Sequence, residues 1–246
     1  MFSHLYRTIG LALAIALSAL TGVGCITQMT VGETSVDQQV APLDDASELD
    51  LTLQLGVGEL SLSGGTIPNA VEAEITSNVD ELRAELESST SGSTAEVTLT
   101  QPNPGTGLPI TTEQIEYRWD VTVNDSVPVD MRIDTGAGQA QLNLTDVLLR
   151  SLSLNLGAGE TTIDLRGNYD QDVDASITGG IGTLTLLLPE DIGVEVTVSA
   201  GISTIITDGL TRDGDRYFNE AFEGADQLIT IELNAGVGEI NLIAGE

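Results

Sequence analysis

One short phrase recurs six times in this 246-residue chain: a glycine, a small apolar residue, and then glycine or serine. Each copy lies in a run where apolar and polar residues alternate, which is the signature of a β-strand with one buried face. An internal repeat of this kind constrains the architecture before any single residue does. The repeated glycines are Gly56, Gly58, Gly136, Gly138, Gly157, Gly159, Gly180, Gly182, Gly201, Gly236 and Gly238.

The alternation slips by one residue at these phrases. From Val57 to the next apolar residue, Leu60, is three positions and not two. One extra residue leaves both halves of the strand facing the same core only if the backbone bulges or turns a corner there, and glycine permits this. We therefore predict long strands that turn a corner at each phrase.

The spacing of the phrases indicates how the strands are arranged. The later copies begin at residues 136, 157, 180, 201 and 236, which gives steps of 21, 23, 21 and 35 residues. Steps near twenty suit one coil of a β-solenoid, in which each coil buries its apolar face against its neighbours. We predict an all-β solenoid of about 21–23-residue coils, with Gly136, Gly157, Gly180 and Gly201 stacked in chain order; a sandwich or meander of short strands is the alternative.

Two departures from the repeat define the predicted regions. The last step holds an insert, residues 208–227, whose aromatic residues suit a cap on the open end of the coils, with a ligand-binding loop as the alternative. The phrase is absent from residues 66–128, although a good alternating strand surrounds Trp119, which we expect to be a core residue. We thus predict an N-terminal β region of less regular coils over residues 48–128 and regular solenoid repeats over residues 129–246.

Three longer phrases carry a family resemblance. Residues 156–246 contain Gly-Gly-Ile-Gly-x-Leu, Leu-Pro-x-Asp-Ile-Gly-Val and Arg-Asp-Gly-x-Arg-Tyr-x-Asn. This stretch resembles the bacterial toast-rack proteins, and residues 51–66 look like the start of that family's N-terminal region. The resemblance implies an envelope protein with repeated β coils, distantly similar to cell-wall antibiotic-response domains and adhesin-like β-solenoids. It supplies no catalytic motif.

The N-terminus has the pattern of an export signal. A basic start, an apolar run over residues 9–20 and a small-residue stretch predict a signal peptide over residues 1–24. Cys25, the only cysteine of the chain, follows at once and resembles the acylated cysteine of a bacterial lipobox, although Gly22 stands where that motif usually has leucine. Ordinary secretion with a free thiol is the alternative.

Lipidation at Cys25 has further consequences for location. Acylation makes the lipid bilayer a partner of the chain, and several fatty chains anchor durably where one does not. The next residue is Ile26 and not aspartate, which by analogy with lipoprotein sorting implies the outer membrane or cell surface. We predict that residues 25–47 comprise the lipidated cysteine and a flexible tether, because they lack clear periodicity.

The composition excludes several classes of function. The formal net charge is −30, no lysine is present, and the one histidine, His4, falls in the predicted signal peptide. A mature chain without histidine, lysine or a free thiol lacks the groups for conventional zinc sites, Ser-His-Asp triads, cysteine nucleophiles and Schiff bases. Its charge repels nucleic acid, so we expect no nucleic-acid partner. We predict no catalytic residues.

The function that fits these observations is non-catalytic. We expect a lipid-anchored envelope protein that presents its solenoid to an unknown envelope protein or cell-wall polymer. The alternative is a calcium-dependent adhesin or glycan-binding protein, for which Asp208, Asp213 and Asp215 are the calcium candidates, although a solvated acidic face explains them without a cofactor. A hydrolase or lyase of acidic polysaccharides rests on fold analogy alone.

Overall fold

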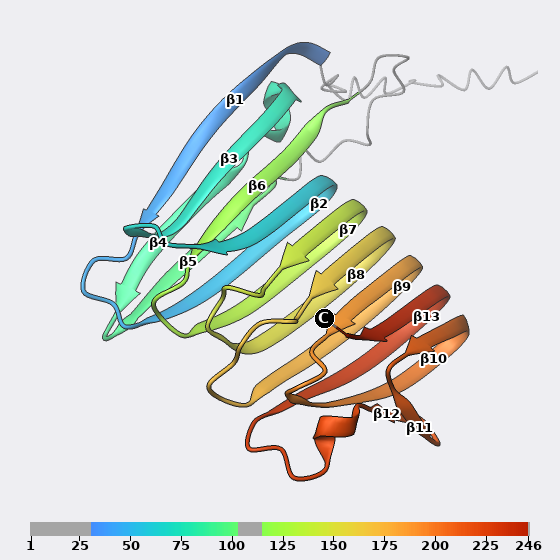
Figure 1. Ribbon diagram of the computed structural model, residues 1–246. Coiled ribbons are helices and arrows are strands. Elements are labelled where there is room, and N and C mark those ends of the chain that lie inside the picture. Colours follow the sequence, from blue (N-terminus) through green and yellow to red (C-terminus); the bar gives the residue numbers. More distant parts are fainter. Residues whose placement is uncertain (1–30, 103–114, 246) are drawn as a thin grey trace, which may run out of the picture.

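The computed structural model describes residues 31–102 and 115–245, which form one sheet of thirteen strands that lie side by side like the slats of a rack (Figure 1). Its only helical elements in these ranges are two 3₁₀ turns, so the predicted all-β fold is confirmed. The strands are β1 (Val31–Pro42), β2 (Glu48–Gly65), β3 (Asn69–Val79), β4 (Glu85–Ser91), β5 (Thr94–Thr100), β6 (Tyr117–Asn124), β7 (Val129–Asn143), β8 (Leu149–Asp164), β9 (Val173–Leu188), β10 (Gly193–Asp208), β11 (Thr211–Asp213), β12 (Arg216–Phe218) and β13 (Leu228–Ala244), and the turns are η1 (Asp80–Leu82) and η2 (Glu220–Phe222).

The six long strands each contain one Gly-x-Gly or Gly-x-Ser phrase, where the strand bends. We call the part before the phrase the first arm and the part after it the second arm. In β8, for example, Leu154 of the first arm and Ile163 of the second arm are both buried in the same core. The slip in the alternation thus lies where the strand turns a corner, and it keeps the apolar face of both arms turned to that core.

The second glycine of five phrases has a positive φ that other residues rarely adopt. These φ angles lie between 144° and 150° at Gly58, Gly138, Gly159, Gly182 and Gly238. The parallel register places these glycines directly beside one another on neighbouring strands. A Cβ added to Gly159 lies only 1.8 Å from the carbonyl oxygen of Gly138, so the close approach of the corners also requires glycine.

The order of the last coils differs from the predicted chain order. The sheet runs β7-β8-β9-β13-β10, so β13 lies between β9 and β10. Gly180 is therefore followed by Gly236, and Gly201 lies outside it on the next strand. The prediction of Gly136, Gly157, Gly180 and Gly201 in one uninterrupted stack is wrong at its last step, because β13, the last strand of the chain, lies between β9 and β10.

The N-terminal region splits the two arms between separate strands. The first arm of β2 pairs with β5 and its second arm pairs with β6. Beyond these, β4 extends β5, while β3 and β1 extend β6 in antiparallel fashion. The strands that flank β2, namely β1 and β3 to β6, carry no Gly-x-Gly phrase, since none of them spans both arms. Trp119 of β6 is fully buried, as expected.

The side chain of Gln101 substitutes for a neighbouring strand at the first corner. Its Oε1 accepts a hydrogen bond of 2.8 Å from the Val57 backbone N–H, and its Nε2 donates one of 3.2 Å to the Val57 carbonyl. At the corners of β7, β8, β9 and β13 a neighbouring long strand takes this place on each side. An amide side chain therefore ends the ladder of corners where the long strands end.

The predicted tether is wrong over residues 31–42, because these form β1. This strand pairs antiparallel with β3 from Val31 to Pro42. Most of its side chains are exposed, so its sequence lacks the alternation that identifies a half-buried strand. Backbone pairing along the sheet edge, which no side-chain pattern records, holds it in place.

Candidate functional site

The middle residues of the six phrases form a row of apolar side chains along the corners, and all but the half-buried Val57 are exposed. Ile181 is 65% exposed, Val237 is 47% exposed and Ile202 is 80% exposed. Strand pairing places each member beside the next, roughly 4.8 Å apart. We call this row the ridge; in spatial order it consists of Val57, Ala137, Ala158, Ile181, Val237 and Ile202.

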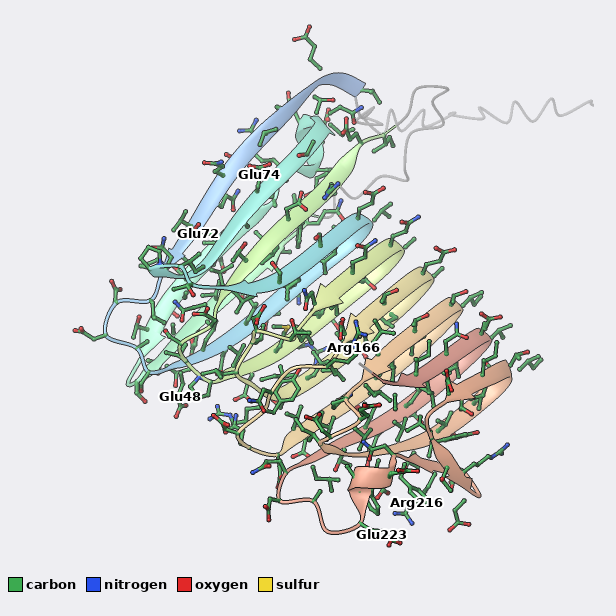
Figure 2. The ribbon with its side chains drawn as sticks, in the orientation of Figure 1. Glu48, Glu72, Glu74, Arg166, Arg216 and Glu223 are labelled. Carbon is green, nitrogen blue, oxygen red and sulfur yellow. The ribbon has the colours of Figure 1, made fainter. Side chains whose placement is uncertain are left out.

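The insert after β10 covers only one arm of that strand. Strand β12 pairs antiparallel with Glu195–Thr197 in the first arm, and β11 pairs with β12 (Figure 1). Tyr217 is 2% exposed in this contact. The guanidinium of Arg216 donates hydrogen bonds of 2.8 and 2.6 Å to the Glu195 carboxylate and lowers the pKa of that carboxyl. We call this insert, residues 209–227, the cap. Figure 2 shows Arg216 of the cap at the end of the rack.

Asn219 fastens the cap to the loop before β10. It is 3% exposed, its Oδ1 accepts a hydrogen bond of 3.0 Å from the Val194 N–H, and its Nδ2 donates to the carbonyls of Pro189 and Ile192 at 3.0 and 2.7 Å. A buried amide with all these partners satisfies three backbone groups that the loop leaves unpaired. Asn219 belongs to the phrase Arg-Tyr-x-Asn, yet the sequence pattern does not reveal this role.

The second arm of β10 is open. Along the inward-facing row of second arms, Leu142, Ile163, Leu186 and Leu242 are each at most 2% exposed, whereas Thr207, their neighbour on β10, is exposed. In the first arm the matching last residue, Val196, is fully buried because the cap lies beside it. The core of the rack is thus closed at one arm and accessible at the other.

The outer edge of β10 beyond the cap is unpaired, and the strand there has little charge and exposed apolar side chains. Within the described part of the chain, no strand pairs with the outer side of residues 199–208, which we call the open edge. Residues 196–207 contain no charged residue in a chain of net charge −30. Of the eight large apolar side chains that are exposed among the described residues, five lie on the last three long strands, namely Ile181, Ile202, Ile206, Val237 and Ile243.

The outward face of the first arms is polar and partly ion-paired. Arg150 forms an ion pair with Asp130 and lies 3.6 Å from the Glu48 carboxylate, which Figure 2 labels near the base of β2. A hydrogen bond from Arg150 lowers the pKa of Asp130. Burial and the nearby Asp130 raise the pKa of Asp50. This group lies on an open sheet face and is compensated by Arg150, so it is best explained as a surface network.

The calcium candidates do not converge. Asp208 ends β10, Asp213 ends β11, and Asp215 lies in the turn that leads to β12. In the ranges that the structure describes, no three acidic, histidine or cysteine side chains group closely enough to hold a metal ion. Cys25 and the predicted signal peptide lie outside the described residues.

Residues 31–102 and 115–245 include no helix with the length and hydrophobicity of a membrane span.

The structure is a one-sheet β-solenoid that is open at one arm. Its strands pair along the whole rack, bend at glycine corners and share a single core.

The sequence comparison places this solenoid in a family. The family model for the N-terminal domain of toast_rack, DUF2154, matches residues 30–187, which is more than half of the chain. The chain therefore belongs to the toast-rack family. No curated protein matches it.

A solved structure shows the same fold. The crystal structure of a proposed cell adhesion protein from Clostridium sporogenes is similar, with a TM-score of 0.81 and 24% sequence identity, over 87% of this chain and 100% of that one. A proposed adhesin from Parabacteroides distasonis matches 87% of this chain and 98% of its own with 12% identity and a TM-score of 0.31.

Proposed function

We propose that this protein is a non-catalytic envelope protein, anchored to the outer membrane or cell surface through acylated Cys25, that binds an envelope protein or cell-wall polymer through the ridge. The observation that carries this proposal is the row of apolar side chains along the ridge, of which the five from Ala137 to Ile202 are exposed. Contiguous exposed apolar surface on a soluble domain usually marks an interaction site. The ridge is notable because the rest of the chain carries 38 acidic residues.

The geometry of the chain suits such a role. Strand β1 begins six residues after Cys25 and lies at one end of the rack, whereas β10 lies eight strand positions away. At roughly 4.8 Å per strand, β10 stands about 38 Å from β1. An anchor at Cys25 thus leaves the more apolar part of the ridge, Ile181 to Ile202, far from the membrane.

The similar Clostridium sporogenes structure, described as a proposed cell adhesion protein, supports adhesion as the form that this binding takes. An adhesive role needs an exposed, rigid surface and no catalytic group. The ridge meets this need because paired strands on both sides fix the backbone of its four inner members, from Ala137 to Val237.

Crosslinking in cells tests the proposal. The native chain, the Cys25→Ser variant and the double variant Ile181→Asn, Val237→Asn are crosslinked, and bound molecules are identified by mass spectrometry. We expect one envelope protein or a peptidoglycan fragment with the native chain and its loss with the double variant. The Cys25→Ser variant should leave the membrane fraction.

A matched control uses Val36, which is 58% exposed on β1 and lies away from the ridge. Val36→Asn should retain the bound molecule. Equal recovery from the native chain and the ridge double variant rejects the ridge as the binding surface, and sedimentation of Cys25→Ser with membranes rejects the lipid anchor.

A further inference from the structure

We propose that a crevice between the loops of the rack binds the side chain of a lysine on a partner protein. These loops join the ends of the arms that lie away from the corners (Figure 1). The crevice is therefore separate from the ridge, and the proposal requires neither the ridge nor the lipid anchor. Its volume is about 180 Å³, and its lining residues are Pro128, Leu148, Leu149, Tyr169, Asp170 and Gln171.

The crevice forms where a long loop follows a short one. Residues 144–148 connect β7 to β8, whereas the connection from β8 to β9 is the longer loop of residues 165–172. A longer loop cannot stack residue for residue on a shorter one in the way that the strands stack. Tyr169 and the two residues after it therefore leave a space between themselves and Leu148.

Hydrogen bonds hold both of these loops in place. The Tyr169 hydroxyl donates one of 3.0 Å to the Leu144 carbonyl, which ties the long loop to the short one. The Leu148 carbonyl accepts one of 2.9 Å from the Val129 N–H at the start of β7. The crevice thus exists before any ligand binds, so little conformational freedom is lost when it is filled.

Most of the lining is apolar. Leu149 and Tyr169 are buried, Pro128 is half-buried, and Leu148 is one of the large apolar side chains that are exposed. A cavity of about 150 Å³ is sufficient to hold benzene. The crevice is larger than this, so it can take an aliphatic group with fewer heavy atoms than benzene.

The polar side of the crevice favours a cation. Asp170 is exposed, and within residues 31–102 and 115–245 it forms no ion pair or hydrogen bond. None of the six lining residues is basic, and the formal net charge of the chain is −30. An anionic ligand is repelled by this field, whereas a cation is attracted to it.

A lysine side chain matches both parts of the crevice. Lysine lays its aliphatic stem along apolar surface while its ammonium group stays at a polar rim. Its side chain also has fewer heavy atoms than benzene. The chain contains no lysine, so neither its own segments nor a second copy can supply this group. Lysines are mostly exposed on protein surfaces, where a partner protein can present one.

An NMR titration tests the chemistry of the crevice. The probes are the peptides acetyl-Gly-Lys-Gly-amide and acetyl-Gly-norleucine-Gly-amide, which are added to the isotope-labelled Cys25→Ser chain. We expect the lysine peptide to shift the amide signals of residues 148–149 and 169–171. It should bind about three- to fivefold more tightly than the norleucine peptide, the contribution of an exposed ion pair. Equal binding of the two peptides, or shifts that spare these residues, overturns the proposal.

Two variants and a control locate the binding. Asp170→Asn should weaken the lysine peptide about three- to fivefold and leave the norleucine peptide unchanged. Leu148→Ser removes part of the apolar wall and should weaken both peptides. Asp191→Asn, an exposed carboxylate of another loop that does not line the crevice, should change neither. The changed side chains are exposed, so all three variants should keep the melting temperature of the Cys25→Ser chain. Affinity for the lysine peptide that resists Asp170→Asn, or that falls equally with Asp191→Asn, contradicts the proposal.

Carbodiimide coupling on intact cells tests the crevice with a whole partner. This reagent joins a carboxylate to a nearby lysine amine as an amide, and the chain has no lysine that could react with its own carboxylates. We expect mass spectrometry to find Asp170 of the native chain linked to a lysine of another protein, and this link should be lost in Leu148→Ser. Links at other carboxylates such as Asp191 without a link at Asp170 overturn the proposal.

Discussion

The replacement Gly159→Ala tests whether the corners of the rack require glycine. Gly159 has a φ of 144°, and a Cβ at this position lies 1.8 Å from the Gly138 carbonyl oxygen. An ordinary contact needs about 3.4 Å, so the two strands must separate by more than an ångström. The backbone of Gly138 has no room to retreat, because its own Cβ position lies 1.8 Å from the Gly58 carbonyl oxygen.

The expected cost follows from two sources. A residue held in a backbone region that suits only glycine costs about 1–3 kcal/mol. Overpacking against neighbouring atoms that cannot move costs about 1–3 kcal/mol more. Alanine recovers about 0.4–1 kcal/mol by reducing the freedom of the unfolded chain. We therefore expect Gly159→Ala to lower the free energy of unfolding by about 1–5.6 kcal/mol, with a central value near 3 kcal/mol.

Urea unfolding, followed by circular dichroism, measures this loss in the Cys25→Ser chain. The control is Gly92→Ala, which also has a positive φ, 64°, but whose Cβ meets nothing within 4 Å. Its cost should stay near 1 kcal/mol, the price of left-handed backbone alone. Equal losses in the two variants refute the argument, because they mean that the stacking of the corners adds nothing.

Three further outcomes follow from individual contacts. Asn219→Ala should lower the free energy of unfolding by about 2–4 kcal/mol, since it leaves buried backbone groups unpaired. The control is Asn241→Ala, whose hydrogen bonds are to partly exposed side chains, and it should lower the free energy of unfolding by less than about 1 kcal/mol in the same urea titration. Asp50→Asn should raise stability at pH 7 by less than about 1 kcal/mol. The raised pKa of Asp50 means that folding disfavours its charged form, so the gain should vanish below pH 3.8, where the carboxyl is protonated in both states; a gain that persists at pH 3 contradicts this cause. Glu195→Gln should speed amide hydrogen exchange in residues 211–222 at pH 7, because the ion pair with Arg216 that holds the cap is lost. Because the pKa of Glu195 is lowered in the folded state, the wild type keeps the stabilisation by this ion pair above pH 4.5 and loses it only as the pH falls through the folded-state pKa. Equal protection of the cap in the variant and the wild type at pH 7 rules out the ion pair as the cause of that protection.

The repeated phrase allowed the bent strands, the all-β class and the stacking of glycine on glycine to be predicted. A local pattern suffices for these features because apolar alternation, its slip and the two flanking glycines all lie within one strand. The buried position of Trp119 was predictable for the same reason, since it alternates with polar neighbours on β6.

The order of β13 and β10 was not predictable. The two strands carry nearly the same alternation around Gly236 and Gly201, so either fits beside β9. The choice depends on which strand the cap covers, and Asn219 and Arg216 decide this through contacts with residues more than 20 positions away. Strand β1 was not predicted, because its side chains are mostly exposed and its sequence shows no alternation of apolar and polar residues.

The sequence by itself determined the form of each coil, where glycine is needed, and the acidic, lysine-free character of the surface. Only the tertiary structure decided which surfaces remain uncovered, namely the ridge and the second arm of β10 from Thr204 to Asp208. The physical reason is that an alternating strand specifies which of its faces is apolar, while the strand or cap that pairs with its edge comes from elsewhere in the chain. Exposure of Thr207, beside the buried Leu242, is therefore a property of what the cap leaves open.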